Sequence, residues 1–355
     1  MASDGAPVDL TCWLLDTRRL WTGDGIEESA SEALQLISAE EREACIRKYH
    51  IADAKMSLGS ALLKRLFVSK TLGIPWKEIK FGRKRDPKHG KPCALLPNGV
   101  QAPVEFNVSH QAGLVTLIGC RTGSPRSNAA DDGAIELGVD IVCVNERNDY
   151  RVIDQEGFDG WVDMYAEIFS TAESWDMKYN IDISGFPLLD GVRVTQDMIG
   201  RHDRCCARDK ELIATFPSGE VRKFSSDLLI DAKLRRFYTY WCYKEAYIKL
   251  DGEALLANWI KELEFRNVKS PQPGTVARCS TAGTWGEWVG DAEVWLKHKR
   301  LQDVRIEIQS FEEDFMIGVA AKSSDRLPDV LTGFKSLHLE EDIMDFAICR
   351  TQEHT

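Results

Sequence analysis

The sequence predicts an α+β fold, built as a pseudo-dimer of two similar α+β lobes in one chain. The 355 residues suffice for about two ordinary domains and a sizeable core. Hydrophobic residues make up 43% and charged residues 28% of the chain, which is the composition of a globular protein. A strand, then helices, then strands occur in each half of the chain, and this repetition favours two lobes that face each other.

The N-terminal lobe is expected to span residues 1–135. It opens with a strand, because Val8 to Leu15 alternate and then become apolar. Ser38 and Glu41 form a capping box that starts a helix running to about Lys48. The other predicted elements of this lobe are a helix over 52–72 and strands over 79–81, 104–109 and 114–120.

The C-terminal lobe is expected to span residues 136–324, and residues 325–355 are expected to form a tail or a small docking segment. Residues 180–225 are irregular and rich in Gly, Pro and charge, so we interpret them as an insertion within this lobe. The other predicted elements are a strand over 136–144, helices over 161–168 and from Thr171, the long helix that carries Glu245, and strands over 263–265, 288–296, 304–309 and 315–320.

Composition also limits the class of protein. No apolar run approaches the length of a membrane span, and the N-terminus lacks the basic and apolar regions of a signal peptide. The ten cysteines have no metal-like spacing, so we interpret them as free thiols in a reducing compartment. The net charge of −11 argues against general binding to nucleic acid. We therefore expect a cytoplasmic monomer with neither nucleic-acid nor membrane partners.

The helix around Trp241 to Lys249 is the most informative segment. Large apolar residues recur there at three- and four-residue spacing and mark a buried face, on which Glu245 falls. A buried carboxylate is costly unless it is paired, hydrogen-bonded or bound to a metal. Lys249 lies one turn further on and Lys244 is adjacent, so this helix can supply a cation ligand and two phosphate partners. The alternative is an ordinary Glu–Lys pair on a solvated helix face.

Asp140 is a second unusual carboxylate, because it interrupts an otherwise apolar strand. Together with Glu245 it is a candidate ligand of Mg²⁺, which typically takes one or two protein carboxylates plus substrate phosphate and water. The alternative is an aspartate that lies at a sheet edge or is satisfied by hydrogen bonds.

Two further segments offer groups that can bind phosphate. Asn107, Ser109, His110 and Gln111 lie close together at a strand end, where a histidine can donate to a phosphate oxygen and an amide oxygen can face a cation. The loop from Arg83 to Pro92 concentrates positive charge in an acidic chain, which suits phosphate, an acidic protein partner or simply a solvated turn. No P-loop or dinucleotide fingerprint occurs, so those nucleotide-binding folds are disfavoured.

Three segments, taken in order, resemble the signature of the 4'-phosphopantetheinyl transferases. They are Phe106-Asn107-Val108-Ser109-His110, Gly138-Val139-Asp140-Ile141 and Trp241-Cys242-Tyr243-Lys244-Glu245-Ala246-Tyr247-Ile248-Lys249. Gly90-Lys91-Pro92 and Phe169-Ser170-Thr171-Ala172-Glu173 match two further segments of that family. The length and doubled layout resemble the broad-specificity, surfactin-type class, and the long 180–225 stretch is similar to fungal members.

This resemblance implies an enzyme that transfers the 4'-phosphopantetheine arm of coenzyme A to a serine of acyl or peptidyl carrier protein domains, releasing adenosine 3',5'-bisphosphate. Fungal members serve fatty acid, polyketide and nonribosomal peptide synthases and the lysine-pathway reductase, so secondary metabolism and lysine biosynthesis are the implied settings. The resemblance also implies dependence on Mg²⁺, with Mn²⁺ as a possible substitute, and coenzyme A as co-substrate.

The resemblance further implies a role for each matching residue. Glu245, Lys249 and His110 would be catalytic, with Glu245 as the base and Lys249 beside the leaving phosphate. Asp140 and Glu245 would bind the metal. Many bacterial members have a further Glu where this chain has Val142; animal-type members without it have Gln at the position of Gln111, which is therefore the implied third ligand. The residues implied to bind coenzyme A are Arg47, Lys48, Arg83, Lys88, Lys91, Pro92, Asn107, Ser109, His110, Lys244 and Lys249.

Two other functions would use similar residues. A non-catalytic module that binds coenzyme A or a carrier protein would keep the basic loop, but it has no need of Asp140 and Glu245 at buried positions. A Mg²⁺-dependent hydrolase of nucleotide pyrophosphates would use the same ligands with water as the nucleophile. Metal dependence distinguishes the first from a transferase, and analysis of the products distinguishes the second.

Overall fold

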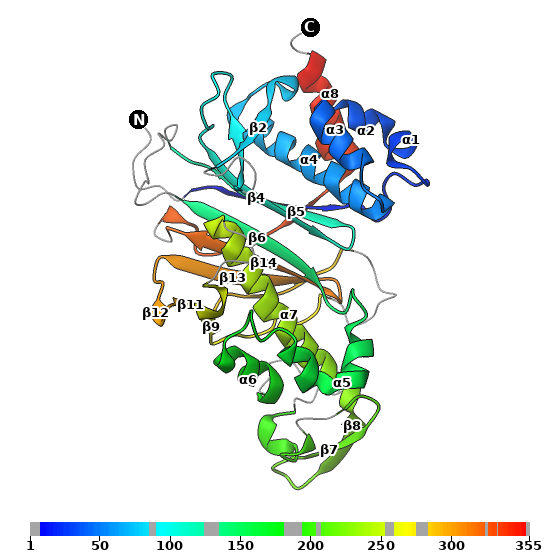
Figure 1. Ribbon diagram of the computed structural model, residues 1–355, viewed down its shortest axis with the longest axis vertical. Helices are drawn as coiled ribbons and strands as arrows, with labels where there is room; N and C mark the ends of the chain where they lie inside the picture. Colours follow the sequence, from blue (N-terminus) through cyan, green and yellow to red (C-terminus); the bar gives the residue numbers. More distant parts are fainter. Residues whose placement is uncertain are drawn as a thin grey trace.

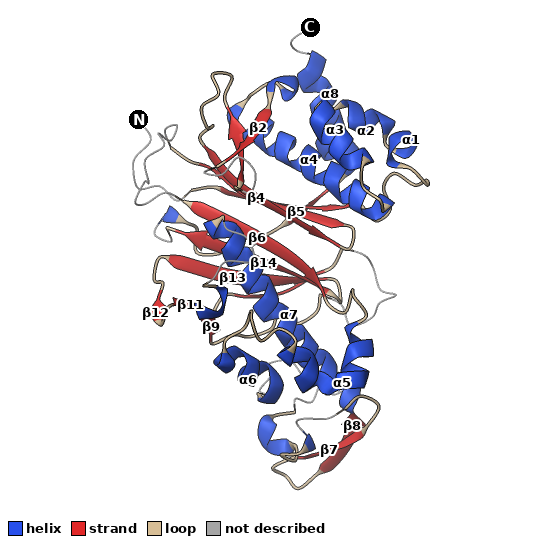
Figure 2. Cartoon of the chain, in the orientation of Figure 1, coloured by secondary structure: helices blue, strands red, loops and turns tan. Residues whose placement is uncertain are grey.

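The computed structural model describes residues 8–84, 90–123, 135–180, 194–203, 207–252, 259–274, 283–323, 326–331 and 333–352. Within these residues two four-stranded sheets lie face to face, and helices cover the outer face of each sheet, so the chain forms four layers (Figures 1 and 2). The predicted α+β class is confirmed.

The N-terminal sheet has the strand order β15-β1-β5-β4, in which β15 is parallel to β1 and the other neighbours are antiparallel. The long helix α4 covers its outer face (Figure 1). The bounds are β1 (Leu10–Asp16), β4 (Val104–Gln111), β5 (Leu114–Arg121), β15 (Lys335–Leu337), α1 (Ile26–Ser29), α2 (Ser31–Gln35), α3 (Ala39–Ile46), α4 (Ile51–Leu72), η1 (Trp76–Glu78), and the hairpin β2 (Lys80–Arg83) with β3 (Pro92–Leu95).

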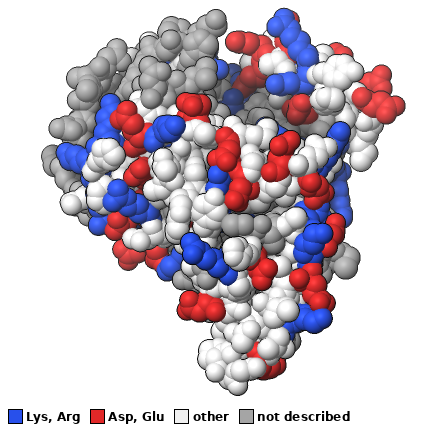
Figure 3. All heavy atoms as spheres, turned by 60° about the horizontal axis from the view of Figure 1, so that its bottom comes forward, with Lys and Arg blue, Asp and Glu red and all other residues white. Residues whose placement is uncertain are grey.

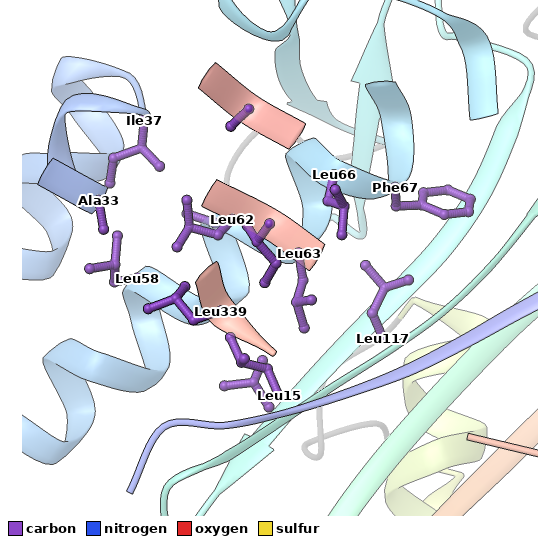
Figure 4. Packing of buried hydrophobic residues seen from close by; sticks show 14 of the residues in the cluster. Leu15, Ala33, Ile37, Leu58, Leu62, Leu63, Leu66, Phe67, Leu117 and Leu339 are labelled. Atoms are coloured by element: carbon purple, nitrogen blue, oxygen red, sulfur yellow. The ribbon is translucent and has the colours of Figure 1, made fainter. Parts of the chain in front are cut away.

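Helix α4 forms the core of this lobe against the sheet. Its residues Leu58, Leu62 and Leu66 are fully buried and belong to one cluster with Leu15 of β1 and Leu117 of β5 (Figure 4). Burying a leucine side chain contributes about 1.5–3 kcal/mol. This packing fixes the N-terminal lobe as a rigid support for the end of β4.

The C-terminal sheet has the order β10-β13-β14-β6, all antiparallel, and helix α7 crosses its outer face (Figure 1). A smaller sheet of order β12-β11-β9 lies in the same lobe. The bounds are β6 (Glu136–Cys143), α5 (Asp149–Asp163), α6 (Thr171–Tyr179), α7 (Ser226–Asp251), η4 (Ile260–Glu262), β9 (Leu263–Arg266), β10 (Trp285–Val289), β11 (Glu293–Leu296), β12 (Lys299–Arg300), β13 (Val304–Phe311) and β14 (Phe315–Lys322).

The inner faces of the two large sheets pack on each other. Leu14 and Ile118 of the N-terminal sheet share a buried cluster with Val139, Ile317 and Val319 of the C-terminal sheet. At one edge of this interface strands β4 and β6 lie side by side (Figure 1). We call this edge the seam; the candidate residues of β4 and β6 meet there.

Three predicted elements differ in the structure. Residues 288–296 are not one strand: β10 and β11 belong to different sheets, and residues 290–292 between them belong to no strand. The helix predicted over 161–168 is α5, which ends at Asp163 and is followed by turns. The predicted irregular insertion contains η2 (Gln196–Met198) and a hairpin of β7 (Glu211–Thr215) and β8 (Val221–Ser225) with a small core of its own.

The predicted C-terminal tail is a folded part of the N-terminal lobe. After β15 the chain forms η6 (Leu339–Met344) and α8 (Asp345–Gln352). Leu337, Leu339 and Ile343 are buried in the same cluster as α4. The end of the chain thus stabilises the lobe in which the chain begins.

None of the described helices is both long and apolar enough to cross a membrane. Basic and acidic side chains are interspersed over the face shown in Figure 3.

Candidate active site

Asp140 and Glu245 come together where helix α7 crosses strand β6. Asp140 lies within β6 and is only 6% exposed, and Glu245 on α7 is half-buried. Burial and the charge of Asp140 raise the pKa of Glu245 to about 7. The two elements touch because Gly138 has no side chain; a Cβ there would lie 2.0 Å from the carbonyl oxygen of Ala246. The two candidate carboxylates therefore share one site.

Lys249 and Ser109 complete the centre of this site. Lys249 Nζ donates to Asp140 Oδ1 at 2.5 Å and to Ser109 Oγ at 2.7 Å. Ser109 Oγ in turn donates to Asp140 Oδ1 at 2.9 Å. Ser109 belongs to β4, so these bonds join the N-terminal lobe to β6 and α7 of the other lobe. The side chain of Lys249 is 29% exposed, which leaves its ammonium group within reach of an anionic ligand.

His110 lies beside this cluster at the exposed end of β4. Partial desolvation of its ring, together with the ammonium groups of Lys249 and Lys48, lowers the pKa of His110. The lowered pKa favours the neutral ring, whose remaining N–H can donate a hydrogen bond to a phosphate oxygen. Lys48 is exposed and near His110, whereas Arg47 is exposed and forms an ion pair with a glutamate of α3.

Gln111 ends β4 and contacts the segment that follows β6. Its Nε2 donates to the carboxylate of Glu146. Ser109 and Gln111 are alternate residues of β4 and so lie on one side of the strand, toward the seam. Because the bond to Glu146 uses the amide nitrogen, the amide oxygen is the atom of Gln111 that can face a cation.

Two residues predicted to bind coenzyme A form hydrogen bonds to other groups of the protein. Lys91 is buried, and its Nζ donates to Glu105 Oε1 at 2.5 Å and to the carbonyl oxygen of Leu137 on β6. Asn107 Oδ1 accepts a hydrogen bond from the N–H of Val139 at 3.0 Å. Both side chains join the N-terminal lobe to β6. The ammonium group of Lys91 and the amide oxygen of Asn107 thus already have partners at the seam, and their contact with coenzyme A stays a prediction.

The basic loop begins and ends on the hairpin of β2 and β3. Arg83 and Pro92 are partners across this hairpin, and both are exposed. Arg83 Nη1 donates to the carbonyl oxygen of Gly90 at 2.8 Å. Lys88, also predicted to bind coenzyme A, lies outside the described residues.

Comparison with known proteins decides the family. Residues 21–122 match the family model described as 4'-phosphopantetheinyl transferase, N-terminal. A 4'-phosphopantetheinyl transferase of Aureobasidium melanogenum is 57% identical over 345 residues, which cover 97% of this chain and 99% of that protein. The chain belongs to the 4'-phosphopantetheinyl transferase family.

Two further relatives of this transferase are similar over different lengths. The 4'-phosphopantetheinyl transferase NpgA of Emericella nidulans is 34% identical, over 95% of this chain and 94% of that protein. The L-aminoadipate-semialdehyde dehydrogenase-phosphopantetheinyl transferase of Schizosaccharomyces pombe is 33% identical over 36% of this chain and 46% of that protein. The predicted family and enzyme class are confirmed.

The donor set of this transferase suits a small, hard cation. Asp140 and Glu245 are close enough that the charge of one raises the pKa of the other, and a bound cation would remove this repulsion. Among the described residues no group of three or more His, Cys, Asp or Glu side chains could hold a metal ion. Two carboxylates, with an amide and water to complete the shell, fit Mg²⁺ better than a metal that needs a full protein cage.

Lys244 of the transferase does not reach this site. Its ammonium group is buried, pairs with Glu173 Oε2 at 2.9 Å, and donates to the carbonyl oxygens of Ile260 and Leu263. These partners match its three donors. Adjacent residues on a helix point about 100° apart, so Lys244 and Glu245 face different surroundings. The predicted contact of Lys244 with coenzyme A is not supported by this geometry.

Lys244→Met should therefore destabilise the transferase without weakening its binding of coenzyme A. The change leaves Glu173 as an unpaired carboxylate that is only 2% exposed, and we expect the free energy of unfolding to fall by about 3–5 kcal/mol. Urea denaturation measures this loss, and calorimetric titration with coenzyme A below the unfolding transition measures affinity. Weaker binding at unchanged stability would instead place Lys244 against the ligand.

Two carboxylates beside the site, Glu105 and Glu146, belong to none of the recognised motifs. Glu105 interrupts an apolar strand as Asp140 does, and this pattern is the available sequence signal of a buried, paired carboxylate. Glu146 lies in a polar turn, where acidic residues are common, so the sequence does not distinguish it from its neighbours.

Proposed function

We propose that this protein transfers the 4'-phosphopantetheine arm of coenzyme A to a serine of apo acyl or peptidyl carrier protein domains, releasing adenosine 3',5'-bisphosphate. The observation that carries the proposal is the junction of Asp140, Glu245 and Lys249 at the seam. This junction offers two carboxylates for a cation and an ammonium group for a phosphate, beside His110. Attack on a pyrophosphate needs these charges in one place.

Each residue has a separate part in the proposed reaction. Mg²⁺, or Mn²⁺ in its place, bound by Asp140, Glu245 and Gln111 would supply positive charge to the pyrophosphate oxygens. Glu245, the carboxylate of α7 beside Asp140, takes the proton of the carrier serine. The serine oxygen bonds to the β-phosphorus while the bond from that phosphorus to the bridging oxygen breaks. Lys249 donates to the departing phosphate, and His110 and the exposed Lys48 contact phosphate oxygens.

The proposed carrier domains belong to fatty acid, polyketide and nonribosomal peptide synthases and to the lysine-pathway reductase. The name of the Schizosaccharomyces pombe relative supports the last of these. We also propose a cytoplasmic monomer without nucleic-acid or membrane partners. The net charge of −11 and the mixed charges over the face in Figure 3 support the absence of these two partners, because nucleic acids and anionic membranes both attract clustered positive charge.

The order of elements supports a pseudo-dimer of two lobes. The lobes span residues 1–135 and 136–324, and residues 180–225 are an insertion in the second lobe. In one lobe β1 precedes α4 and the hairpin β4–β5; in the other β6 precedes α7 and the hairpin β13–β14. In both, the first strand pairs with the second strand of the hairpin.

Contacts between the lobes support the same relation. Arg18, which follows β1, binds Glu312 in the turn between β13 and β14 through two hydrogen bonds of 2.7 and 2.8 Å. Glu146, which follows β6, binds Gln111 at the turn between β4 and β5. Equivalent positions in the two lobes thus exchange partners, as expected for a two-fold arrangement.

The experiment that tests this function is intact-mass spectrometry of apo carrier proteins incubated with this chain, coenzyme A and Mg²⁺. A gain of one phosphopantetheine mass on the carrier, abolished by a chelator, supports the transferase. Hydrolysis of coenzyme A without a carrier would favour the hydrolase. Binding of coenzyme A with no gain on several carrier types would favour the non-catalytic module.

The assignment of Gln111 as a metal ligand predicts an effect of its partner Glu146. Glu146→Ala removes the acceptor that orients the Gln111 amide, so we expect the affinity for Mn²⁺ to fall about tenfold, as for other groups that orient a ligand. Titration followed by electron paramagnetic resonance measures this affinity. Glu156→Ala, at an exposed glutamate of α5, is the matched control. Equal affinity in the two variants would remove Gln111 from the metal site.

A further inference from the structure

Glu105 is a buried carboxylate that binds two lysines at once. It lies on β4 and is 1% exposed. Its Oε1 accepts a hydrogen bond from Lys91 Nζ at 2.5 Å, and its Oε2 accepts one from Lys84 Nζ. Burial of one negative charge is offset by two positive charges, which is the condition for keeping a carboxylate inside a protein.

The two lysines stand at the base of the basic loop. The N–H of Lys84 donates to the carbonyl oxygen of Lys91 at 2.8 Å, which continues the pairing of β2 with β3. Next to them Arg83 Nη1 donates to the carbonyl oxygen of Gly90. The segment between, residues 85–89, lies outside the described residues. Glu105 therefore binds both sides of the loop base and ties them to β4.

The same contacts tie the loop base to the catalytic strands. Lys91 Nζ also donates to the carbonyl oxygen of Leu137, three residues before Asp140 on β6. Glu105 and Ser109 are four residues apart on β4 and therefore lie on the same side of the strand, facing the seam. A displacement of Glu105 would move the loop base relative to the bonds between Ser109 and Asp140.

We propose that Glu105 is a positioning residue for coenzyme A. It withholds Lys84 and Lys91 from direct phosphate contact, and it fixes the loop base so that the exposed Arg83 meets the anionic ligand beside the site. This inference rests on the proposed function. An opposite arrangement, in which the two lysines bind phosphate themselves, predicts an opposite effect, because removal of the Glu105 charge would then release them toward the ligand.

The test is Glu105→Gln in the full chain. The two lysines bind different oxygens of Glu105, and in glutamine one of these becomes an uncharged NH₂ donor that cannot accept. We therefore expect the Kd and the KM for coenzyme A to rise about tenfold while kcat changes little. Calorimetry gives Kd, and mass gain on an apo carrier protein gives KM and kcat. Lys84→Met, which removes the more exposed lysine (18% exposed against 6%), should shift KM in the same direction.

Glu173→Gln is the matched control. Glu173 is also buried and paired with a lysine, Lys244, but this pair lies away from the site. The Glu173→Gln variant should have a lower melting temperature and an unchanged KM for coenzyme A. An unchanged or smaller Kd in Glu105→Gln, or an equal rise of KM in Glu173→Gln, would overturn the inference.

Failure of the proposed function gives a different result. If the wild-type protein binds coenzyme A but transfers nothing, weaker binding by Glu105→Gln still supports the positioning role, and only the transfer is refuted. If the wild-type protein transfers and Glu105→Gln binds coenzyme A as well as the wild type does, only the positioning role is refuted.

Discussion

Asp140→Asn should lower phosphopantetheine transfer by about 10³-fold or more while the protein stays folded. Asparagine preserves the shape and can still accept the hydrogen bonds of Lys249 and Ser109, but it removes a negative charge that a cation at this site requires. Glu245→Gln should have an effect of similar size, because it removes the second carboxylate and the proposed base. The initial rate of mass gain on an apo carrier protein measures the loss.

Lys249→Met distinguishes loss of the cation from loss of the phosphate contact. It leaves both carboxylates in place, and it removes an ammonium group that occupies Asp140 Oδ1. Binding of Mn²⁺ should therefore be kept in Lys249→Met and lost in Asp140→Asn, although transfer falls in both. Circular dichroism and thermal melting confirm folding. Substantial turnover in both carboxylate variants would refute the assignment of this site.

The sequence is sufficient to indicate Asp140 and Glu245 because both break a local rule. An aspartate within an apolar strand and a glutamate on the apolar face of a helix are costly unless something neutralises them. In the structure they lie together, and burial with mutual repulsion raises the pKa of Glu245. The local sequence is enough to single out each carboxylate. Burying a carboxylate costs free energy whichever distant residue later pairs with it.

The roles of the lysines could not be predicted in the same way. Helix α7 is buried on nearly all sides, and Cys242, Tyr243 and Ala246 are inaccessible to solvent. The sequence pattern therefore does not indicate which lysine of the helix faces a ligand. Lys249 reaches Asp140, whereas Lys244 is taken up by Glu173. Such pairings join elements that are distant in the sequence, and they depend on how the helix is rotated on its sheet.

Short elements at the chain ends were unpredictable for a related reason. Strand β15 has three residues and would not be stable alone; it exists because β1, at the other end of the chain, offers a free edge. The split of residues 285–296 between two sheets likewise follows from which neighbours are present. The long helix α4, which ends at Gly73 ahead of Pro75, needs no such partner to be recognised.

Among the glycines that the structure describes, Gly138 should be the one at which alanine does the most damage. A Cβ at this position would lie 2.0 Å from the carbonyl oxygen of Ala246 and 2.5 Å from the backbone nitrogen of Leu250. Both are backbone atoms of α7, so no change of rotamer relieves the contact, and the helix must move away from β6. We expect a loss of about 3 kcal/mol in the free energy of unfolding. Urea denaturation measures it.

The same displacement should reduce transfer in the fraction that remains folded. Glu245 and Lys249 lie on the segment of α7 that packs directly against Gly138. A shift of about 1 Å in the position of a catalytic group can lower the rate about 10²-fold. Gly318→Ala, whose Cβ would meet the side-chain sulfur of Cys242 at 2.8 Å, should be milder because that side chain can shift. Gly25→Ala has no neighbour within 4 Å and should be neutral. If Gly138→Ala were as stable and active as Gly25→Ala, close contact between β6 and α7 could not be what assembles the site.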